Sequence, residues 1–215
     1  YLARDSGSLT MQRAGQHTLN IAWRCRGRPL AMALHFGASA VTATIEARGK
    51  VPEEAGRAAI LLLVRLLGRT TATLAFEQRA RTDTAVKRLL ADRLGLGISL
   101  THTPFDAAVW SIIGQQISLP FAYQMLRSAT QLAGAQAPGG LRTMPLPERL
   151  ADMTTDALRA CKFSASKARY LIDIAGLVSE GSLTLDDRSR TSAKRLFERL
   201  LAVRGLGPWS VNYIM

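Results

Sequence analysis

The spacing of apolar residues changes near residue 84. Before it, apolar and polar residues alternate in short runs at Thr18–Trp23, Leu30–Phe36 and Ala40–Ala47, the pattern of half-buried strands. From about Asp83 onward, apolar residues recur at helical spacing. We therefore predict an α+β domain over residues 1–84, with a small antiparallel sheet and helices, followed by an all-α domain over residues 85–215.

Local signals place the elements within these two domains. In the first, Pro52 and two glutamates open a predicted helix that runs to Leu67 and is closed by Gly68. The next stretch, Thr70–Phe76, is predicted to be another short strand. In the second domain we predict helices at about Thr84–Leu94, Thr103–Ser118, Leu119–Ala133, Pro147–Asp152, Thr155–Ala160, Ser164–Ser179 and Ser189–Val203.

The sharpest signal is a helical hairpin in residues 201–215. A predicted helix stops at Arg204, the chain turns on G-L-G from Gly205 to Gly207, and a new helix starts at Pro208. Glycine permits a positive φ and lets another backbone come close. We interpret this stretch as a helix-hairpin-helix. The alternative is an ordinary turn between two helices with a glycine cap.

A hairpin of this kind directs backbone N–H groups toward an anion. The N–H groups around Gly207, Trp209 and Ser210 stand at the start of the second helix, where the helix dipole also favours a phosphate. Leu206 is expected to pack between the two helices. The sequence therefore predicts contact with a nucleic-acid backbone at this turn.

Two further segments carry polar residues beside apolar runs. An apolar run from Pro104 ends in Gly114 and two glutamines, Gln115 and Gln116. Exposed there, the glutamines could reach base edges or fill a gap in a base stack; the alternative is a polar helix end that makes caps. A second tight turn follows residue 158, and its basic residues suit either a phosphate backbone or a solvated face. These residues are Lys162, Lys167 and Arg169.

Charge and cysteine content narrow the class of protein. Of the 215 residues, 28 are Lys or Arg and 16 are Asp or Glu, a formal net charge of +12. Such a charge favours polyanionic partners, although an arginine-rich genome would give the same excess. Cys25 and Cys161 form neither a metal-ligand cluster nor a disulfide framework, which fits a reducing cytosol. No apolar stretch is long enough to span a membrane, so we expect a cytoplasmic protein without a membrane partner.

These segments, in this order and spacing, resemble the helix-hairpin-helix DNA glycosylase superfamily, and within it the bacterial DNA-3-methyladenine glycosylase II type. The family pattern F-[DE]-x-x-V-x-x-[IL]-[IL]-G-Q-x-[IV]-S matches from Phe105 to Ser118. The hairpin pattern G-[IVL]-G-x-W-[ST]-x-x-Y matches from Gly205 to Tyr213. The resemblance covers about residues 85–215, and residues 1–84 look like the small antiparallel-sheet domain of this type. It implies that the all-α domain is a helix-hairpin-helix glycosylase domain.

The resemblance implies base-excision repair of DNA. Enzymes of this type remove alkylated purines, such as 3-methyladenine and 7-methylguanine, by flipping the base and hydrolysing its N-glycosidic bond. The implied partner is double-stranded DNA containing alkylated bases in the bacterial nucleoid, and we expect a monomer. Two alternatives remain: a non-catalytic helix-hairpin-helix DNA-binding module, and a glycosylase for other bases such as uracil or oxidised guanine.

Carried over residue by residue, the resemblance assigns the site. Gly205, Gly207 and Ser210 bind the DNA phosphate, and Trp209 and Tyr213 wall the pocket for the flipped base. Gln115 and Gln116 lie at the gap that the base leaves, with Gln116 as the wedge. Backbone carbonyls near Arg204, Gly205 and Gly207 hold a monovalent cation, Na⁺ or K⁺. No other cofactor is expected.

The resemblance also indicates what this chain does not supply. Trp209 stands where bifunctional members carry a Schiff-base lysine, which implies a monofunctional enzyme. Two cysteines cannot bind the four-thiolate iron–sulfur cluster of some relatives. The catalytic Asp of the family follows the second hairpin helix, whereas the last carboxylate here is Glu198. We therefore expect that Asp beyond Met215, in a longer protein, and expect these residues to bind DNA without excising bases.

Overall fold

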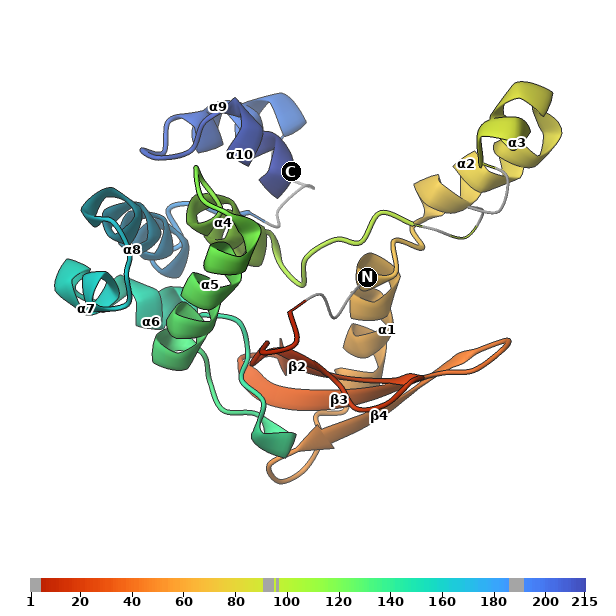
Figure 1. Cartoon of the computed structure of the whole chain (residues 1–215), viewed down its shortest axis with the longest axis horizontal. Coiled ribbons are helices and arrows are strands. Elements are labelled where there is room, and N and C mark those ends of the chain that lie inside the picture. Colours follow the sequence, from red (N-terminus) through yellow and green to blue (C-terminus); the bar gives the residue numbers. More distant parts are fainter. Residues whose placement is uncertain (1–4, 91–94, 96, 186–191) are drawn as a thin grey trace. The chain divides into compact units, whose positions relative to one another are not determined.

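The computed structural model describes residues 5–90, 95, 97–185 and 192–215. The chain forms two compact units (Figure 1). One unit combines the residues up to Val51 with Thr103–Met215, and the other consists of Pro52–His102. The domain boundary at residue 84, which rests on the change of hydrophobic period, stays a prediction.

The first unit begins with a four-stranded antiparallel sheet in the order β1-β2-β3-β4. The three predicted strands are confirmed, and β1 adds a strand of only three residues, too short to show an alternating pattern. Ile21 lies opposite Met32, which lies opposite Ile45, so the larger apolar side chains share one face of the sheet. The strands are β1 Met11–Arg13, β2 Thr18–Cys25, β3 Arg28–Phe36 and β4 Val41–Ala47.

The other face of the sheet packs against a loop of the helical part. Ala22 and Ala31 form a buried cluster with Ala137 and Leu141. This loop, predicted from its glycines and prolines, contains one turn of 3-10 helix, η2, at Pro138–Gly140. The Arg142 amide also donates to the Leu9 carbonyl at 2.7 Å. The sheet is therefore joined to the helices through backbone and side-chain contacts within one unit.

The rest of this unit is helical, as predicted, but the helix predicted at Thr103–Ser118 ends at Ile113 and a short turn precedes the next helix. The hydroxyls of Thr103, Thr154, Ser164 and Ser192 each accept a hydrogen bond from a backbone N–H in the first turn of a helix. The predicted helix at Ser189–Val203 is shorter than expected in its described part, and residues 189–191 lie outside the described residues. The helices are α4 Pro104–Ile113, α5 Leu119–Ala133, α6 Pro147–Ala151, α7 Thr155–Ala160, α8 Ala165–Ser179, α9 Ala193–Leu201 and α10 Pro208–Ile214.

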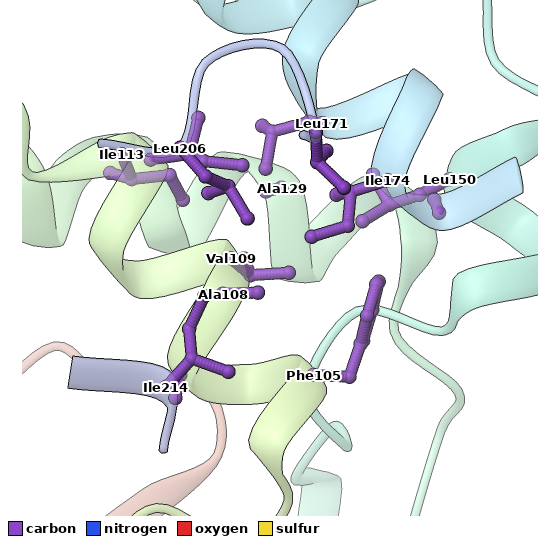
Figure 2. Packing of buried hydrophobic residues seen from close by; sticks show 14 of the residues in the cluster. Phe105, Ala108, Val109, Ile113, Ala129, Leu150, Leu171, Ile174, Leu206 and Ile214 are labelled. Atoms are coloured by element: carbon purple, nitrogen blue, oxygen red, sulfur yellow. The ribbon is translucent and has the colours of Figure 1, made fainter. Parts of the chain in front are cut away.

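Helix α4 is the centre of the helical core. Nine of its ten residues are buried, and it packs against α5, α8 and α10. Figure 2 shows Phe105, Val109 and Ile113 of α4 together with Leu171 of α8 and Ile214 of α10. A capping box starts the helix: the Thr103 hydroxyl accepts from the Asp106 amide, and the Asp106 carboxylate accepts from the Thr103 amide.

The second unit contains α1 Ala55–Leu66, α2 Thr71–Thr82 and α3 Thr84–Leu90. The long helix predicted at Pro52–Leu67 is confirmed as α1. The prediction of a strand at Thr70–Phe76 is wrong, because Thr70 caps α2 and the residues after it form its first turns. The Thr70 hydroxyl accepts from the Thr73 amide at 3.2 Å and caps this helix. Of the helix predicted at Thr84–Leu94, residues 91–94 lie outside the described residues.

Two local contacts hold this second unit together. The buried Glu77 carboxylate accepts from Arg69 at 2.7 Å and from the Gly95 amide at 3.1 Å. Gly68 closes α1 with φ +62°, and a Cβ there would overlap the backbone of Gly97 and Ile98. No single helix in the described part is long and apolar enough to cross a membrane; α1 and α2, bent by 46°, reach the required length and composition only together.

Candidate nucleic-acid interface

The predicted helical hairpin is present between α9 and α10. Leu206 is buried and packs into the helical core, as expected of the residue between the two helices (Figure 2). The Leu206 amide donates to the Val203 carbonyl at 3.1 Å, and the Val211 amide donates to the Gly207 carbonyl at 3.0 Å. The turn is therefore fixed by its own backbone hydrogen bonds and by one apolar anchor.

The two glycines of the hairpin have different roles. Gly205 has φ +92°, and a Cβ there would lie 2.3 Å from the ring of Tyr170 on α8. Gly207 has φ −94° and ψ 176°, an extended conformation that any residue adopts, and a Cβ there would meet nothing within 4 Å. The positive φ expected of this turn thus belongs to Gly205. Gly207 is exposed and leaves the start of α10 uncovered.

An aromatic pair lies on the outer face of α10. Trp209 and Tyr213 are one helical turn apart, and their rings stack with centroids 5.5 Å apart at 17°. The exposed fractions are 64% for Trp209 and 43% for Tyr213, whereas Ser210, Val211 and Ile214 are buried. Because the two rings already contact each other, a third ring would stack on their exposed side rather than between them.

The two glutamines after α4 lie in different surroundings. The Gln115 amide donates from Nε2 to the Gly205 carbonyl at 2.8 Å and to the Ser210 hydroxyl at 3.4 Å. Gln116 has φ +54° and is exposed. Of the two residues predicted at the base gap, Gln115 is thus bound to the hairpin, and Gln116 is the one that solvent reaches.

Helix α8 contacts both the end of α4 and the hairpin turn. The Lys167 ammonium donates to the Ile113 carbonyl at 2.7 Å, at the last residue of α4. Partial burial lowers the pKa of Lys167 below its ordinary value. Tyr170, one turn further along, lies against Gly205. Of the three basic residues considered for phosphate contact, Lys167 is therefore half-buried and hydrogen-bonded to α4, whereas Lys162 and Arg169 are exposed.

Two acidic residues differ in their availability for chemistry. Asp106 is buried and bound in the capping box of α4, with its Oδ2 accepting from the Thr103 amide at 3.0 Å. Asp173 is exposed and lines an open groove of about 1020 Å³ along α8 and α9. Within the described residues, no group of three or more His, Cys, Asp or Glu side chains is placed to hold a metal ion.

Sequence comparison relates this chain to DNA repair proteins. A family described as "HhH-GPD superfamily base excision DNA repair protein" matches residues 109–206. The DNA-3-methyladenine glycosylase of Bacillus subtilis is 30% identical over 143 residues, 65% of this chain and 47% of that protein. The DNA-3-methyladenine glycosylase 2 of Escherichia coli is 29% identical over 131 residues, 60% of this chain and 46% of that protein. The chain thus spans about half the length of these curated relatives.

Structure comparison gives the same fold. A 3-methyladenine DNA-glycosylase from Archaeoglobus fulgidus has a TM-score of 0.77 at 20% identity, covering 96% of this chain and 69% of that one. An 8-oxoguanine glycosylase/lyase of Clostridium acetobutylicum, in complex with double-stranded DNA, has a TM-score of 0.65 at 15% identity, covering 96% and 77%. The matched residues 109–206 include the turn after α4 and reach into the hairpin turn as far as Leu206. These residues are thus similar to the HhH-GPD superfamily of base excision DNA repair proteins, and the relatives named above carry the same resemblance over 60–65% of the chain.

Proposed function

We propose that this chain is the DNA-binding and base-recognising part of a monofunctional DNA glycosylase that removes alkylated purines, of the 3-methyladenine and 7-methylguanine type. The observation that carries the proposal is the exposed Trp209–Tyr213 pair directly after the hairpin turn. Trp and Tyr are enriched at interaction surfaces, and two stacked exposed rings form a contiguous apolar patch rather than a single exposed side chain. The names of the curated relatives support alkylated purines as the bases that this surface recognises.

In the proposed reaction the protein flips the damaged nucleotide out of the duplex and stacks its base on the aromatic pair. Alkylation at a ring nitrogen makes the purine cationic, and a cation is attracted to the face of an aromatic ring by about 1–2 kcal/mol when water is excluded. Such a base is already a good leaving group, so little acid catalysis is needed. The hairpin around Gly205, Gly207 and Ser210 holds the phosphate backbone, and Gln116 enters the gap in the base stack.

Two further parts of the proposal concern a monovalent cation and the catalytic carboxylate. A monovalent cation could bind the carbonyls near Arg204, Gly205 and Gly207, because carbonyl oxygens suit Na⁺ and K⁺. Two of these carbonyls already accept hydrogen bonds, from Gln115 and from the Val211 amide, so the ion would use their second lone pairs. No step above depends on it. Helix α10, Pro208–Ile214, contains no Asp or Glu, so the side chains of the second hairpin helix supply no catalytic carboxylate in this proposal.

Replacing Trp209 by Ala tests the aromatic pair. The chain and the Trp209→Ala variant are titrated against a duplex containing one 7-methylguanine and against the same duplex without it. We expect the variant to bind the plain duplex as the parent does and to lose about tenfold or more of its preference for the modified duplex, because base–aromatic stacking contributes about 1–3 kcal/mol.

A matched control is Phe76→Ala, which removes another exposed aromatic ring on α2 in the second unit. This variant should keep the parent's preference for the modified duplex. If Trp209→Ala keeps the same preference for the modified duplex as Phe76→Ala, the aromatic pair does not stack with the flipped base. If the parent chain shows neither duplex binding nor preference, the proposed function fails. Release of methylated bases by the parent chain would instead place the catalytic carboxylate within it, with exposed Asp173 as the first residue to examine.

A further inference from the structure

We propose that Gln115 is a positioning residue, which ties the turn after α4 to the hairpin and fixes the geometry of both DNA-facing segments before DNA binds. The expected effect on DNA binding rests on the proposed function, but the hydrogen bonds of Gln115 are present in the free protein. It departs from the expectation that Gln115 fills the gap in the base stack together with Gln116.

The geometry of the Gln115 side chain carries this inference. Its amide group has two N–H donors, and both point at the hairpin: the Gly205 carbonyl lies 2.8 Å from Nε2 and the Ser210 hydroxyl lies 3.4 Å from it. Ser210 is 3% exposed, so this contact is partly buried. A side chain held in this way cannot at the same time reach a gap in the duplex.

The hairpin needs such a tie because its turn has few other anchors from outside. Leu206 anchors it to the core, and the Tyr170 ring lies against Gly205. A ring in van der Waals contact limits how close the turn comes to α8 but does not fix the direction of the Gly205 carbonyl. A hydrogen bond does fix that direction, and Gln115 supplies it from a residue 90 positions away in the sequence.

The same tie sets the position of Gln116. Gln116 directly follows the tied residue, and its left-handed backbone, φ +54°, turns the chain back toward α5. On the other side of Gln115, the Lys167 ammonium holds the Ile113 carbonyl at 2.7 Å. The turn after α4 is thus held at one end by Lys167 and at the other by the hairpin. This fixes the position of Gln116 relative to the hairpin, so that one duplex can contact both.

The test compares Gln115→Met with Gln116→Met in the free protein by amide hydrogen exchange, followed in peptides that cover residues 201–215. Met has nearly the length of Gln but no donor. We expect Gln115→Met to speed exchange of the Leu206 and Val211 amides about five- to tenfold, with α5 and α8 unchanged, because one partly buried hydrogen bond is lost. Gln116→Met should leave all of these rates unchanged. Equal rates in parent and Gln115→Met would overturn the inference.

A second variant keeps the test decisive if Gln115→Met does not fold, as judged from its thermal melting. Gln115→Glu retains size and polarity, but its carboxylate cannot donate to the Gly205 carbonyl at neutral pH. Hairpin exchange, corrected for the intrinsic pH dependence, should therefore be faster than in the parent at pH 7. It should return toward the parent rate as the pH falls through the carboxyl pKa, because the protonated group regains a donor. Lack of this pH profile would contradict the proposed role of the hydrogen bond from residue 115 to the hairpin.

DNA titration separates this inference from the proposed function. If the tie positions the hairpin, Gln115→Met should weaken binding to a plain duplex about five- to tenfold, in parallel with the faster exchange. A gap-filling role would spare plain duplex and affect only DNA with a flipped or missing base, which would overturn the inference. Faster hairpin exchange in a chain whose parent binds no DNA would support the tie and reject the proposed function.

Discussion

Two turns in the helical part of the chain each contain one residue with a left-handed backbone. The turn between α7 and α8 has Lys162 at φ +70°, and the hairpin between α9 and α10 has Gly205 at φ +92°. Lys162 is exposed, and its side chain extends into solvent. At Gly205, by contrast, the place that a side chain would take is already filled by the Tyr170 ring.

The difference separates two reasons for glycine in a turn. A positive φ disfavours a residue with a Cβ by roughly 1–2 kcal/mol, which a lysine in an open turn can tolerate. Close approach of another group excludes a Cβ altogether unless that group moves. The hairpin therefore requires glycine at Gly205 mainly because the Tyr170 ring of α8 comes so near.

The largest effect should follow from Gly205→Ala. The new Cβ would both occupy a left-handed position and overlap the Tyr170 ring, so we expect a loss of about 2–5 kcal/mol in the free energy of unfolding, measured by urea denaturation. Gly139→Ala is the matched control, because Gly139 has φ +69° but nothing within 4 Å of a Cβ. That variant should lose only about 1–2 kcal/mol. Equal losses in both variants would show that close approach adds nothing.

A smaller and different effect is expected from Gly207→Val. Because Gly207 has an extended backbone and open space, its replacement should change the free energy of unfolding by about 0.5 kcal/mol or less. Duplex binding should nevertheless fall about tenfold, since the bulky side chain would keep a phosphate from the start of α10. The loss should be similar for different DNA sequences and shrink at high salt.

Gly15→Val serves as its control, because Gly15 also has open space around it but lies between β1 and β2. It should bind the duplex as the parent does. If Gly207→Val also binds plain duplex as well as the parent chain, the hairpin is an ordinary turn between two helices, and the phosphate contact proposed here is wrong.

The smallest effect should come from Lys162→Gly. Glycine would relieve the left-handed strain at this turn but make the unfolded chain more flexible, so we expect a net gain of about 0–1 kcal/mol in the free energy of unfolding. Lys162→Ala, which keeps the strain and removes the same charge, should show no gain. A similar loss of stability in both variants would mean that the lysine side chain holds the turn.

The sequence predicted the elements better than their contacts. Alternating residues located β2, β3 and β4, and capping hydroxyls with helical spacing located most helices. The short segment at Thr70–Phe76 was assigned wrongly because its pattern is too brief to distinguish a strand from the first turns of a helix, which the Thr70 cap decides.

The candidate site was predictable only in its residue types. Two glycines two residues apart look equivalent in sequence, and only the folded backbone shows that Gly205 carries the positive φ and that Gly207 is extended. Two adjacent glutamines also look equivalent, but the fold brings Gly205 to one of them from 90 residues away. Such distinctions depend on tertiary packing between distant segments, which local periodicity does not encode.

The central position of α4 has a consequence for synthesis of the chain on the ribosome. Helix α4 is complete at Ile113, yet α10, which packs against it, is not complete until Ile214. At roughly 5–20 residues per second, the roughly one hundred residues between them take about 5–20 s to make. During that interval an almost wholly apolar helix lacks part of its cover, and the nascent chain is open to chaperones or to association with other chains.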